Sequence, residues 1–175
     1  SIFSEILGKY FSKKKKNRKK IVLIGNYKIF KEQLKKLKYN INCNKISDIN
    51  NAEFNKVNFI NIDTNLKKIF DKISIKSKKL VSDTFNKALK ISKDLKNRII
   101  LINGPISKKA FLDKKYYGVT EYLAYKTKRK NEVMLIFNKK FSVSPVTTHL
   151  PVKNIAKNIT KDKIINNINK INEFY

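Results

Sequence analysis

The only histidine of the chain, His149, is the residue best suited to acid–base chemistry or metal binding. It follows two hydroxyl residues in the string Val-Thr-Thr-His-Leu-Pro-Val, and Pro151 fixes the backbone just beyond it. We therefore expect its imidazole in a polar turn at a strand end. A catalytic zinc-type site needs about three protein ligands, so any metal at His149 takes its other ligands from elsewhere. A structural or surface role for a lone histidine is the alternative.

A turn of sequence Gly-Pro-Ile-Ser-Lys, residues 104–108, offers a different chemistry. It leads from an expected strand into an expected helix, whose first backbone amides, with Lys108 and Lys109 beside them, can hold a phosphate. Gly104, Ser107 and Lys108 are accordingly candidates for an anion-binding turn. The glycine-rich repeat of a nucleotide-binding loop is absent, and an ordinary tight turn is the alternative.

The string Gly-Val-Thr-Glu-Tyr-Leu-Ala, residues 118–124, predicts the start of a helix. Gly118 ends a turn, and Thr120 is placed to cap the helix. Glu121 falls in the first turn, where the helix dipole favours an acidic side chain. Taken alone, this pattern indicates local structure and no chemistry.

Apolar runs alternate with amphipathic stretches ahead of these strings, which predicts an α/β fold with a mostly parallel sheet. The Asn-Gly-Pro break at 103–105 places the candidate anion turn at the carboxyl end of a strand, where open parallel sheets bind ligands. The expected strands are 21–25, a weak one at 40–46, 57–62 and, most convincingly, 99–102. The expected helices are 27–38 and 76–95, the second with Val81, Phe85, Ala88 and Leu95 on one face.

The two ends of the chain predict further elements. Residues 133–137 and 141–146 are apolar runs expected to form an antiparallel pair, and a last helix is expected after the N-cap Thr160. Residues 1–20 combine an amphipathic helix with a basic turn, for which we favour packing on the domain over a membrane-surface role. The chain thus divides into segments 1–20, an α/β segment 21–103, a motif-bearing segment 104–160, and a helix 161–175 that we expect to be truncated.

The chain of 175 residues has 41 lysines and arginines against 13 acidic residues, a formal net charge of +28. Such a charge suggests nucleic-acid binding through phosphates. However, only Arg18, Arg98 and Arg129 are arginines, and the lysines are dispersed among Ile, Leu and Phe. We therefore favour compositional drift and expect no specific nucleic-acid partner, with a basic nucleic-acid-binding module as the alternative.

The composition also limits the class of protein and the compartment that we expect. Hydrophobic residues make up 41% of the chain, which is too apolar for a disordered protein. No window reaches the ~18 consecutive apolar residues of a membrane span. Cys43 stands alone, which excludes an internal disulfide and fits a reducing compartment. We expect a cytoplasmic protein without a membrane partner.

In order and spacing, four strings resemble the 4-hydroxythreonine-4-phosphate dehydrogenase family of pyridoxal phosphate (vitamin B6) biosynthesis. They are 104–108, 118–124, Val-Met-Leu at 133–135 and Thr-Thr-His-Leu-Pro-Val-Lys at 147–153. The resemblance is specific over 99–160 and looser before it. It implies a three-layer α/β/α fold of the isocitrate and isopropylmalate dehydrogenase type and a homodimer. It also implies NAD-dependent oxidation and decarboxylation of 4-phosphooxy-L-threonine, a small phosphorylated substrate.

The same resemblance implies a divalent metal (Zn, Mg or Co) that three histidines from both subunits bind and that polarises substrate oxygens. His149 matches the first of these ligands. The other two belong to family motifs that this chain lacks, as do most of the cofactor contacts. We therefore expect residues 1–175 to be an internal fragment of a dehydrogenase that is inactive alone.

The substrate-contacting pair of the family's Gly-His-Thr-Glu motif is matched only in part: Thr120 matches the threonine, but Val119 replaces the histidine. Valine forms no side-chain hydrogen bond, so either the substrate differs or a neighbour such as Tyr117 compensates. A dehydrogenase of other four-carbon acid phosphates, such as threonate or erythronate phosphate, is the enzyme alternative. The enzyme hypothesis requires His149, Thr120 and Lys108 to converge, whereas a nucleic-acid module requires lysines clustered with exposed aromatics.

Overall fold

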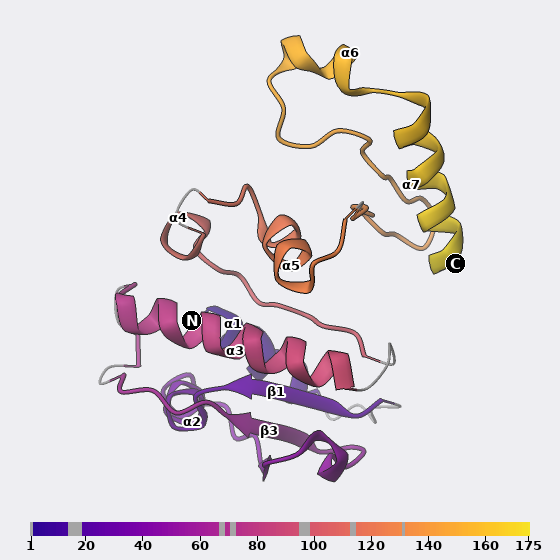
Figure 1. Cartoon of the computed structure of the whole chain (residues 1–175). Helices are drawn as coiled ribbons and strands as arrows, with labels where there is room; N and C mark the ends of the chain where they lie inside the picture. Colours follow the sequence, from indigo (N-terminus) through magenta and orange to yellow (C-terminus); the bar gives the residue numbers. More distant parts are fainter. Residues whose placement is uncertain are drawn as a thin grey trace. The chain divides into compact units, whose positions relative to one another are not determined.

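The computed structural model describes residues 2–13, 19–66, 69–70, 73–94, 99–112, 115–130 and 132–175. They form two compact units, Ser1–Phe111 and Leu112–Tyr175. The first contains α1 (Ile2–Phe11), β1 (Ile21–Gly25), α2 (Tyr27–Lys36), β2 (Cys43–Ile46), the 3₁₀ turn η1 (Ile49–Asn51), β3 (Val57–Asn61), α3 (Ile75–Asp94) and α4 (Lys108–Phe111). The second contains α5 (Val119–Thr127), the 3₁₀ turn η2 (Val152–Asn154), α6 (Ile155–Asn158) and α7 (Lys161–Phe174) (Figure 1).

Three parallel strands form the sheet of the first unit, in the order β1-β3-β2. β1 pairs with β3 from Ile21 opposite Val57 onward, and β2 pairs with the other edge of β3 from Cys43 opposite Val57. The central strand β3 has four consecutive buried residues, as expected of a strand covered on both faces. The strands predicted at 21–25, 40–46 and 57–62 are therefore confirmed, the last two with shorter bounds.

The main apolar core lies between the sheet and α2. One buried cluster joins Phe30 and Leu34 of α2 to Ile41, Cys43, Val57 and Phe59, with Leu7 and Phe11 of α1 packed against it. Burial raises the pKa of the Cys43 thiol.

Because α1 contacts this core, the favoured interpretation of the N-terminal helix, packing on the domain, is confirmed. The basic turn that follows falls partly at 14–18, outside the described residues.

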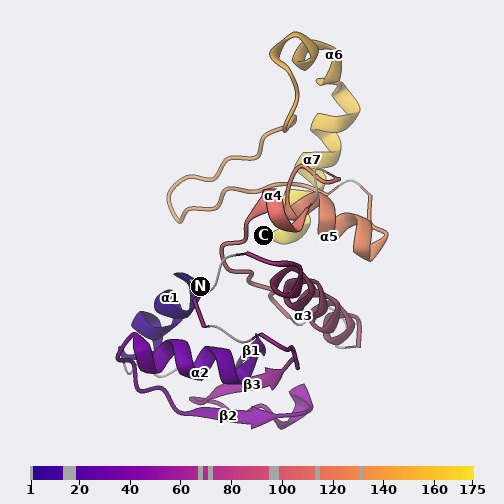
Figure 2. The ribbon, with the colours of Figure 1, turned by 90° about the vertical axis from the view of Figure 1, so that its left-hand side faces the viewer.

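Helix α3 covers the other face of the sheet. Figure 2 shows α2 and α3 on opposite sides of the strands, so helix, sheet and helix form three layers. Phe85 and Ala88 of α3 are buried, and Phe85 stacks on Phe111 of α4 with ring centroids 5.7 Å apart. The predicted helix and the α/β/α fold class are thus confirmed, whereas Leu95 lies outside the described residues.

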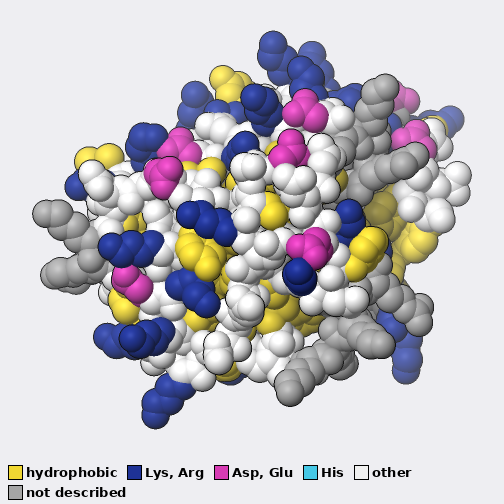
Figure 3. Space-filling model, turned by 90° about the horizontal axis from the view of Figure 1, so that it is seen from below, with side chains coloured by type: hydrophobic (Ala, Val, Ile, Leu, Met, Phe, Trp, Pro, Cys, Tyr) yellow, Lys and Arg dark blue, Asp and Glu magenta, His cyan; other side chains and the backbone are white. Residues whose placement is uncertain are grey.

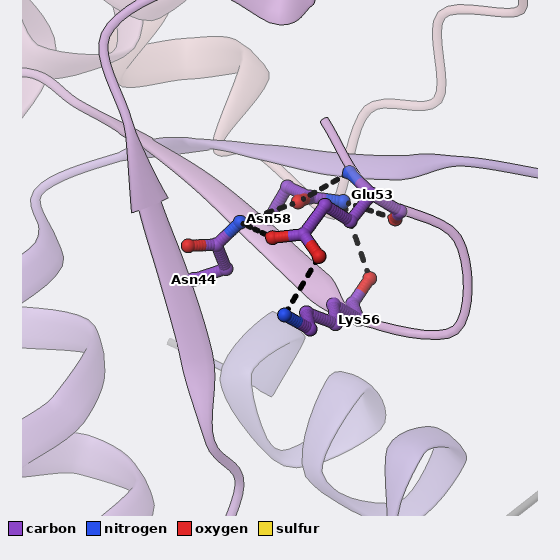
Figure 4. Close-up of polar contacts among 4 residues, drawn as sticks. All are labelled: Asn44, Glu53, Lys56 and Asn58. Carbon is purple, nitrogen blue, oxygen red and sulfur yellow. Dashed lines mark hydrogen bonds and ion pairs between the residues drawn. The ribbon is translucent and has the colours of Figure 1, made fainter. Parts of the chain in front are cut away.

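The side chain of Asn58 in β3 is fully buried, and its amide connects the amino ends of the strands through hydrogen bonds (Figure 4). Its nitrogen donates to the carbonyls of Ile21 (3.0 Å), Glu53 (2.9 Å) and Lys56 (3.3 Å). Its oxygen accepts from the backbone N–H of Glu53 at 3.0 Å and from the side chain of Asn44 at 3.2 Å. Both polar atoms of the amide are therefore partnered, which is the condition for burying an amide at low cost.

The apolar run 99–102, predicted as the most convincing buried strand, is not a strand, so this prediction is wrong. Its backbone joins no sheet within the described ranges. Ile100 and Ile102 are 73% and 76% exposed. Apolar side chains favour burial, but a strand also needs a neighbouring backbone to pair with its N–H and C=O groups. An apolar run does not supply that neighbour.

The second unit contains one antiparallel contact between extended segments. Ile136 and Val143 exchange both backbone hydrogen bonds, at 2.8 and 3.0 Å. The antiparallel pair predicted for 133–137 and 141–146 is therefore confirmed in its direction. In the part of the unit that the structure describes, the pairing is limited to this bridge.

Helix α7 begins as predicted. The hydroxyl of Thr160 is its N-cap and accepts a hydrogen bond from the backbone N–H of Lys163 at 3.3 Å. The apolar stripe of the helix is open to solvent, with Ile164 and Ile168 exposed by 39% and 58%. Its periodicity therefore predicted the helix but not the burial of its apolar face.

On one face of the molecule, the basic side chains are not gathered into a single patch. On the face in Figure 3, Lys and Arg are interspersed with Asp and Glu and with uncharged groups. Some pair locally along a helix, as Lys9 does with Glu5 at 2.7 Å. This face therefore lacks the single basic patch that a nucleic-acid module presents. Within the described ranges, no helix combines the length and the apolarity needed to cross a bilayer.

Candidate functional site

The start of α5 contains the string with the partial substrate motif. Gly118 is the N-cap, with an extended backbone and no side-chain hydrogen bond. The prediction that Thr120 caps this helix is wrong, because the helix already begins at Val119 and Thr120 lies inside its first turn. Glu121 occupies the first turn as predicted, where the helix dipole favours a carboxylate.

His149 lies against this helix start. Its Nε2 atom is 3.9 Å from Oε1 of Glu121, which is too long for a hydrogen bond but within ion-pair range. The two side chains are 38% and 27% exposed, so the pair is only partly hydrated. His149 also has a φ angle of +57°, in the left-handed region that costs a residue other than glycine ~1–2 kcal/mol. Backbone strain of this kind is enriched at functional positions.

Gly118 leaves the space in which the Glu121 carboxylate sits. A Cβ atom at position 118 would lie 2.9 Å from Oε2 of Glu121 and 3.9 Å from Nε2 of His149. Oε2 of Glu121 is buried and has no hydrogen-bond partner among the described residues. A buried oxygen in that state costs roughly 1–3 kcal/mol. This oxygen is therefore available to accept a hydrogen bond or to bind a cation.

Tyr117 covers one face of the His149 ring. The two rings are nearly parallel, at 17°, with centroids 5.8 Å apart, and Tyr117 is 73% exposed. Val119 and Thr120, which follow after Gly118, are half-buried. The structure thus brings His149 to the same helix start that carries Thr120 and Val119, with a phenol ring beside the imidazole.

The candidate anion turn lies in the first unit and packs against an aromatic ring. A Cβ at Gly104 would overlap the ring of Phe3 from α1, so this glycine makes room for that ring. Ser107 and Lys108 are exposed, and α4, which starts at Lys108, has only four residues. Lys108 and His149 belong to different units, so their convergence stays a prediction.

The residues around His149 include donor atoms of the kinds that bind cations. In the ranges that the structure describes, no three His, Cys, Asp or Glu side chains gather as a metal ion needs. The donors that do meet, an imidazole nitrogen and carboxylate oxygens, are ones that divalent cations such as Zn²⁺ accept. The partly exposed imidazole of His149 therefore fits a cation whose remaining ligands come from outside these residues.

Glu121 is the residue of this site that the sequence did not single out for chemistry. The spacing of Gly118 and Glu121, three positions apart, was visible and places both on one side of a helical turn. The approach of His149 depends on how the chain returns after α5 and the Ile136–Val143 bridge. That return is a tertiary contact, which local periodicity does not predict.

Comparison with known proteins finds related sequences. The family model described as pyridoxal phosphate biosynthetic protein PdxA matches residues 17–175. A 4-hydroxythreonine-4-phosphate dehydrogenase from a Sulfurihydrogenibium species is 40% identical over 74 residues, which are 41% of this chain and 23% of that protein. The matched family therefore extends over both units of the structure.

Solved structures share the fold. The crystal structure of 4-hydroxythreonine-4-phosphate dehydrogenase from Klebsiella pneumoniae has a TM-score of 0.72 at 20% identity, covering 87% of this chain and 48% of that chain. A structure from Salmonella typhimurium has a TM-score of 0.77 at 21% identity, covering 95% and 53%. At such identities the likeness establishes the fold alone. The chain spans about half the length of these two structures.

Proposed function

Because the chain belongs to the family of the pyridoxal phosphate biosynthetic protein PdxA, we propose that the whole protein is a metal- and NAD-dependent dehydrogenase. Its proposed substrate is 4-phosphooxy-L-threonine, which it oxidises and decarboxylates in pyridoxal phosphate biosynthesis. We further propose that it acts in the cytoplasm as a homodimer. Within this chain, the observation that supports the proposal most directly is the 3.9 Å approach of His149 to Glu121 at the start of α5.

His149 and Thr120 have separate roles in this proposal. His149 donates an imidazole nitrogen to the divalent cation (Zn, Mg or Co), and its partly exposed ring is accessible for this purpose. Thr120 offers a hydroxyl to the substrate from the first turn of α5. When bound, the cation supplies Lewis-acid polarisation of substrate oxygens. The protein's own task is to hold the imidazole and the hydroxyl at fixed positions before substrate arrives.

No residue of this chain is assigned to NAD. Its four glycines, Gly8, Gly25, Gly104 and Gly118, are far apart in the sequence and form no dinucleotide-binding loop. Ser107 and Lys108, both exposed, are proposed contacts for the substrate phosphate next to Gly104. The net charge of +28 favours encounter with an anionic substrate in a general way.

The test measures NADH formation by the whole gene product with 4-phosphooxy-L-threonine, NAD and a divalent cation. We expect turnover that requires the cation and that His149→Ala removes. We expect residues 1–175 alone to give none, because the residues that the structure describes do not complete a metal site. Turnover of the whole protein that persists in His149→Ala, or its complete absence with every cation tested, would contradict the proposal.

A second substrate class is supported by one observation, the valine at position 119. Val119 removes a hydrogen-bonding group beside Thr120, so threonate or erythronate phosphate is the alternative substrate. Comparing kcat/KM for both substrate classes in the wild type and in Val119→His separates the two. If 4-phosphooxy-L-threonine is the substrate and Tyr117 compensates, the wild type prefers it and Tyr117→Leu raises its KM. A wild type that prefers the other acids favours the alternative.

A further inference from the structure

We propose that Glu121 is the positioning residue of His149: its carboxylate accepts a hydrogen bond from the ring N–H that faces it and leaves the other ring nitrogen for the divalent cation. This inference rests on the proposed function of His149 as a cation ligand. It adds a residue and a role to the site, namely a carboxylate that selects the orientation of the imidazole.

The chain keeps space open for this carboxylate. A side chain at position 118 would begin 2.9 Å from Oε2 of Glu121, so any residue larger than glycine displaces the carboxylate. The backbone of Gly118 is extended, a conformation that every residue adopts. The glycine is therefore explained by the room it gives to Glu121.

The carboxylate of Glu121 lies close to the imidazole of His149, and one of its oxygens is buried. Oε2 of Glu121 is buried without a hydrogen-bond partner within the described ranges, while Oε1 points to Nε2 of His149 at 3.9 Å. A contraction of about an ångström converts this approach into a hydrogen bond, since N–H···O bonds span ~2.7–3.2 Å. A histidine that ligates a metal almost always donates its other ring N–H to a carboxylate, a carbonyl or water. Here the carboxylate is already in place.

Two further features restrict the position of the His149 ring. Tyr117 stacks on its face at 17°, and the left-handed backbone of His149 fixes the direction in which the side chain leaves the chain. A ring fixed by stacking and by its backbone still has two edges. The Glu121 carboxylate decides which edge turns inward and which one faces a ligand.

The decisive experiment uses proton NMR of the ring of His149 in the whole gene product, where its two C–H resonances are identified as those that His149→Ala removes. It is run without metal at about pH 9, where ordinary imidazoles are neutral. In the wild type, stacking on Tyr117 displaces both resonances from model-peptide values. We expect Glu121→Ala to return them toward those values because the ring turns, and Glu121→Gln, whose amide oxygen still accepts a hydrogen bond, to keep them near wild type.

Glu132→Ala is the matched control, since it removes a carboxylate of the same unit and should leave the His149 resonances unchanged. Unchanged amide resonances of α7, which belongs to the same unit, exclude unfolding as the cause in every variant. If Glu121→Ala leaves the ring resonances as in the wild type, or if Glu121→Gln shifts them as far as Glu121→Ala, the proposal is overturned.

A second measurement separates this proposal from the proposed function. Co²⁺ binding to the whole gene product, followed by visible absorption, should weaken ~10–100-fold in Glu121→Ala and much less in Glu121→Gln. Equal losses in the two variants would contradict positioning and indicate a directly ligating carboxylate, because an amide oxygen replaces a carboxylate poorly as a ligand. If the NMR contrast is present but the wild type binds no cation, the proposed function fails while the Glu121–His149 contact stands.

Discussion

Two polar clusters of this molecule have opposite properties. Around Asn58 in the sheet, a buried amide makes five hydrogen bonds that join both neighbouring strands to the turn before β3. Around His149, a buried carboxylate oxygen has no partner in the described part of the chain, and the histidine has a strained backbone. Both polar atoms of Asn58 have partners, whereas Oε2 of Glu121 is available to accept a hydrogen bond or to bind a cation.

This difference separates structural polar groups from functional ones. Each bond of Asn58 is made to groups of the same unit, so the network contributes to folding without any ligand. The Glu121–His149 pair keeps a destabilising arrangement that folding alone does not reward, as expected of a site that is organised before its ligand binds. We therefore expect substitutions around Asn58 to lower the free energy of unfolding far more than those around His149, where relief of the backbone strain should raise it.

The largest stability effect is expected for Asn58→Ala. It leaves the backbone N–H of Glu53 and the carbonyl of Ile21 without their side-chain partner, and each such buried group costs about 1–3 kcal/mol. We expect the free energy of unfolding to fall by about 3 kcal/mol in urea titrations. Asn44→Ala, at the solvent side of the network, should cost less than about 1 kcal/mol. Equal effects would show that Asn58 is not the centre of the network.

The next largest changes in the free energy of unfolding concern two glycines that both make room for a side chain. Gly104→Ala meets the rigid ring of Phe3 and should cost about 2 kcal/mol, as overpacking does. Gly118→Ala meets the movable end of Glu121 and should cost less than about 1 kcal/mol, mainly through the helix cap. Urea denaturation of both variants measures the contrast, and the reverse order would contradict the assignment of Gly118 to the site.

A smaller effect of opposite sign is expected for His149→Gly. It relieves the left-handed backbone, so the free energy of unfolding should rise by about 0.5–1 kcal/mol, part of the strain relief being offset by the flexibility of glycine. Lys128→Gly is the control, since Lys128 also has a left-handed backbone, at the end of α5. It should stabilise by a similar amount while leaving the proposed activity intact. A destabilised His149→Gly would show that the imidazole contributes to folding.

The smallest stability effect is expected for Glu121→Gln. The substitution keeps the size of the side chain and loses a charge that is about a quarter exposed. We expect a change of less than about 0.5 kcal/mol in the free energy of unfolding, measured by thermal and urea denaturation. A loss as large as that of Asn58→Ala would make Glu121 a structural residue and remove the distinction between the two clusters.

The sequence predicted local elements well and tertiary partners poorly. The helices at 27–38 and 76–95 and the strand at 21–25 followed from periodicity and apolar runs, because these patterns depend on neighbours along the chain. The run 99–102 has the same apolar character but no strand partner in the described ranges, and no local pattern reports that. Asn58 was not predicted either, since its burial depends on carbonyls from β1 and from the turn before β3.

The sequence singled out two residues of the candidate site, whose roles stay predictions, and did not single out a third. His149 and Thr120 stood out through their strings, and the structure brings His149 to the helix start that contains Thr120. The cap assigned to Thr120 was wrong by two positions, because glycine also serves as an N-cap. Glu121 is a candidate site residue only because His149 lies close to it. The two residues are far apart in the sequence, and the Ile136–Val143 bridge lies between them.

The central claim is that the His149 cluster is functional and the Asn58 cluster structural. The most direct test is the rate of cation-dependent NADH formation per folded molecule of the whole gene product, compared between His149→Ala and Asn58→Ala. We predict a loss of at least ~10²-fold for His149→Ala, more than the ~10–100-fold typical of groups that only support a ligand, and a wild-type rate for Asn58→Ala. A wild-type rate in His149→Ala would contradict the account.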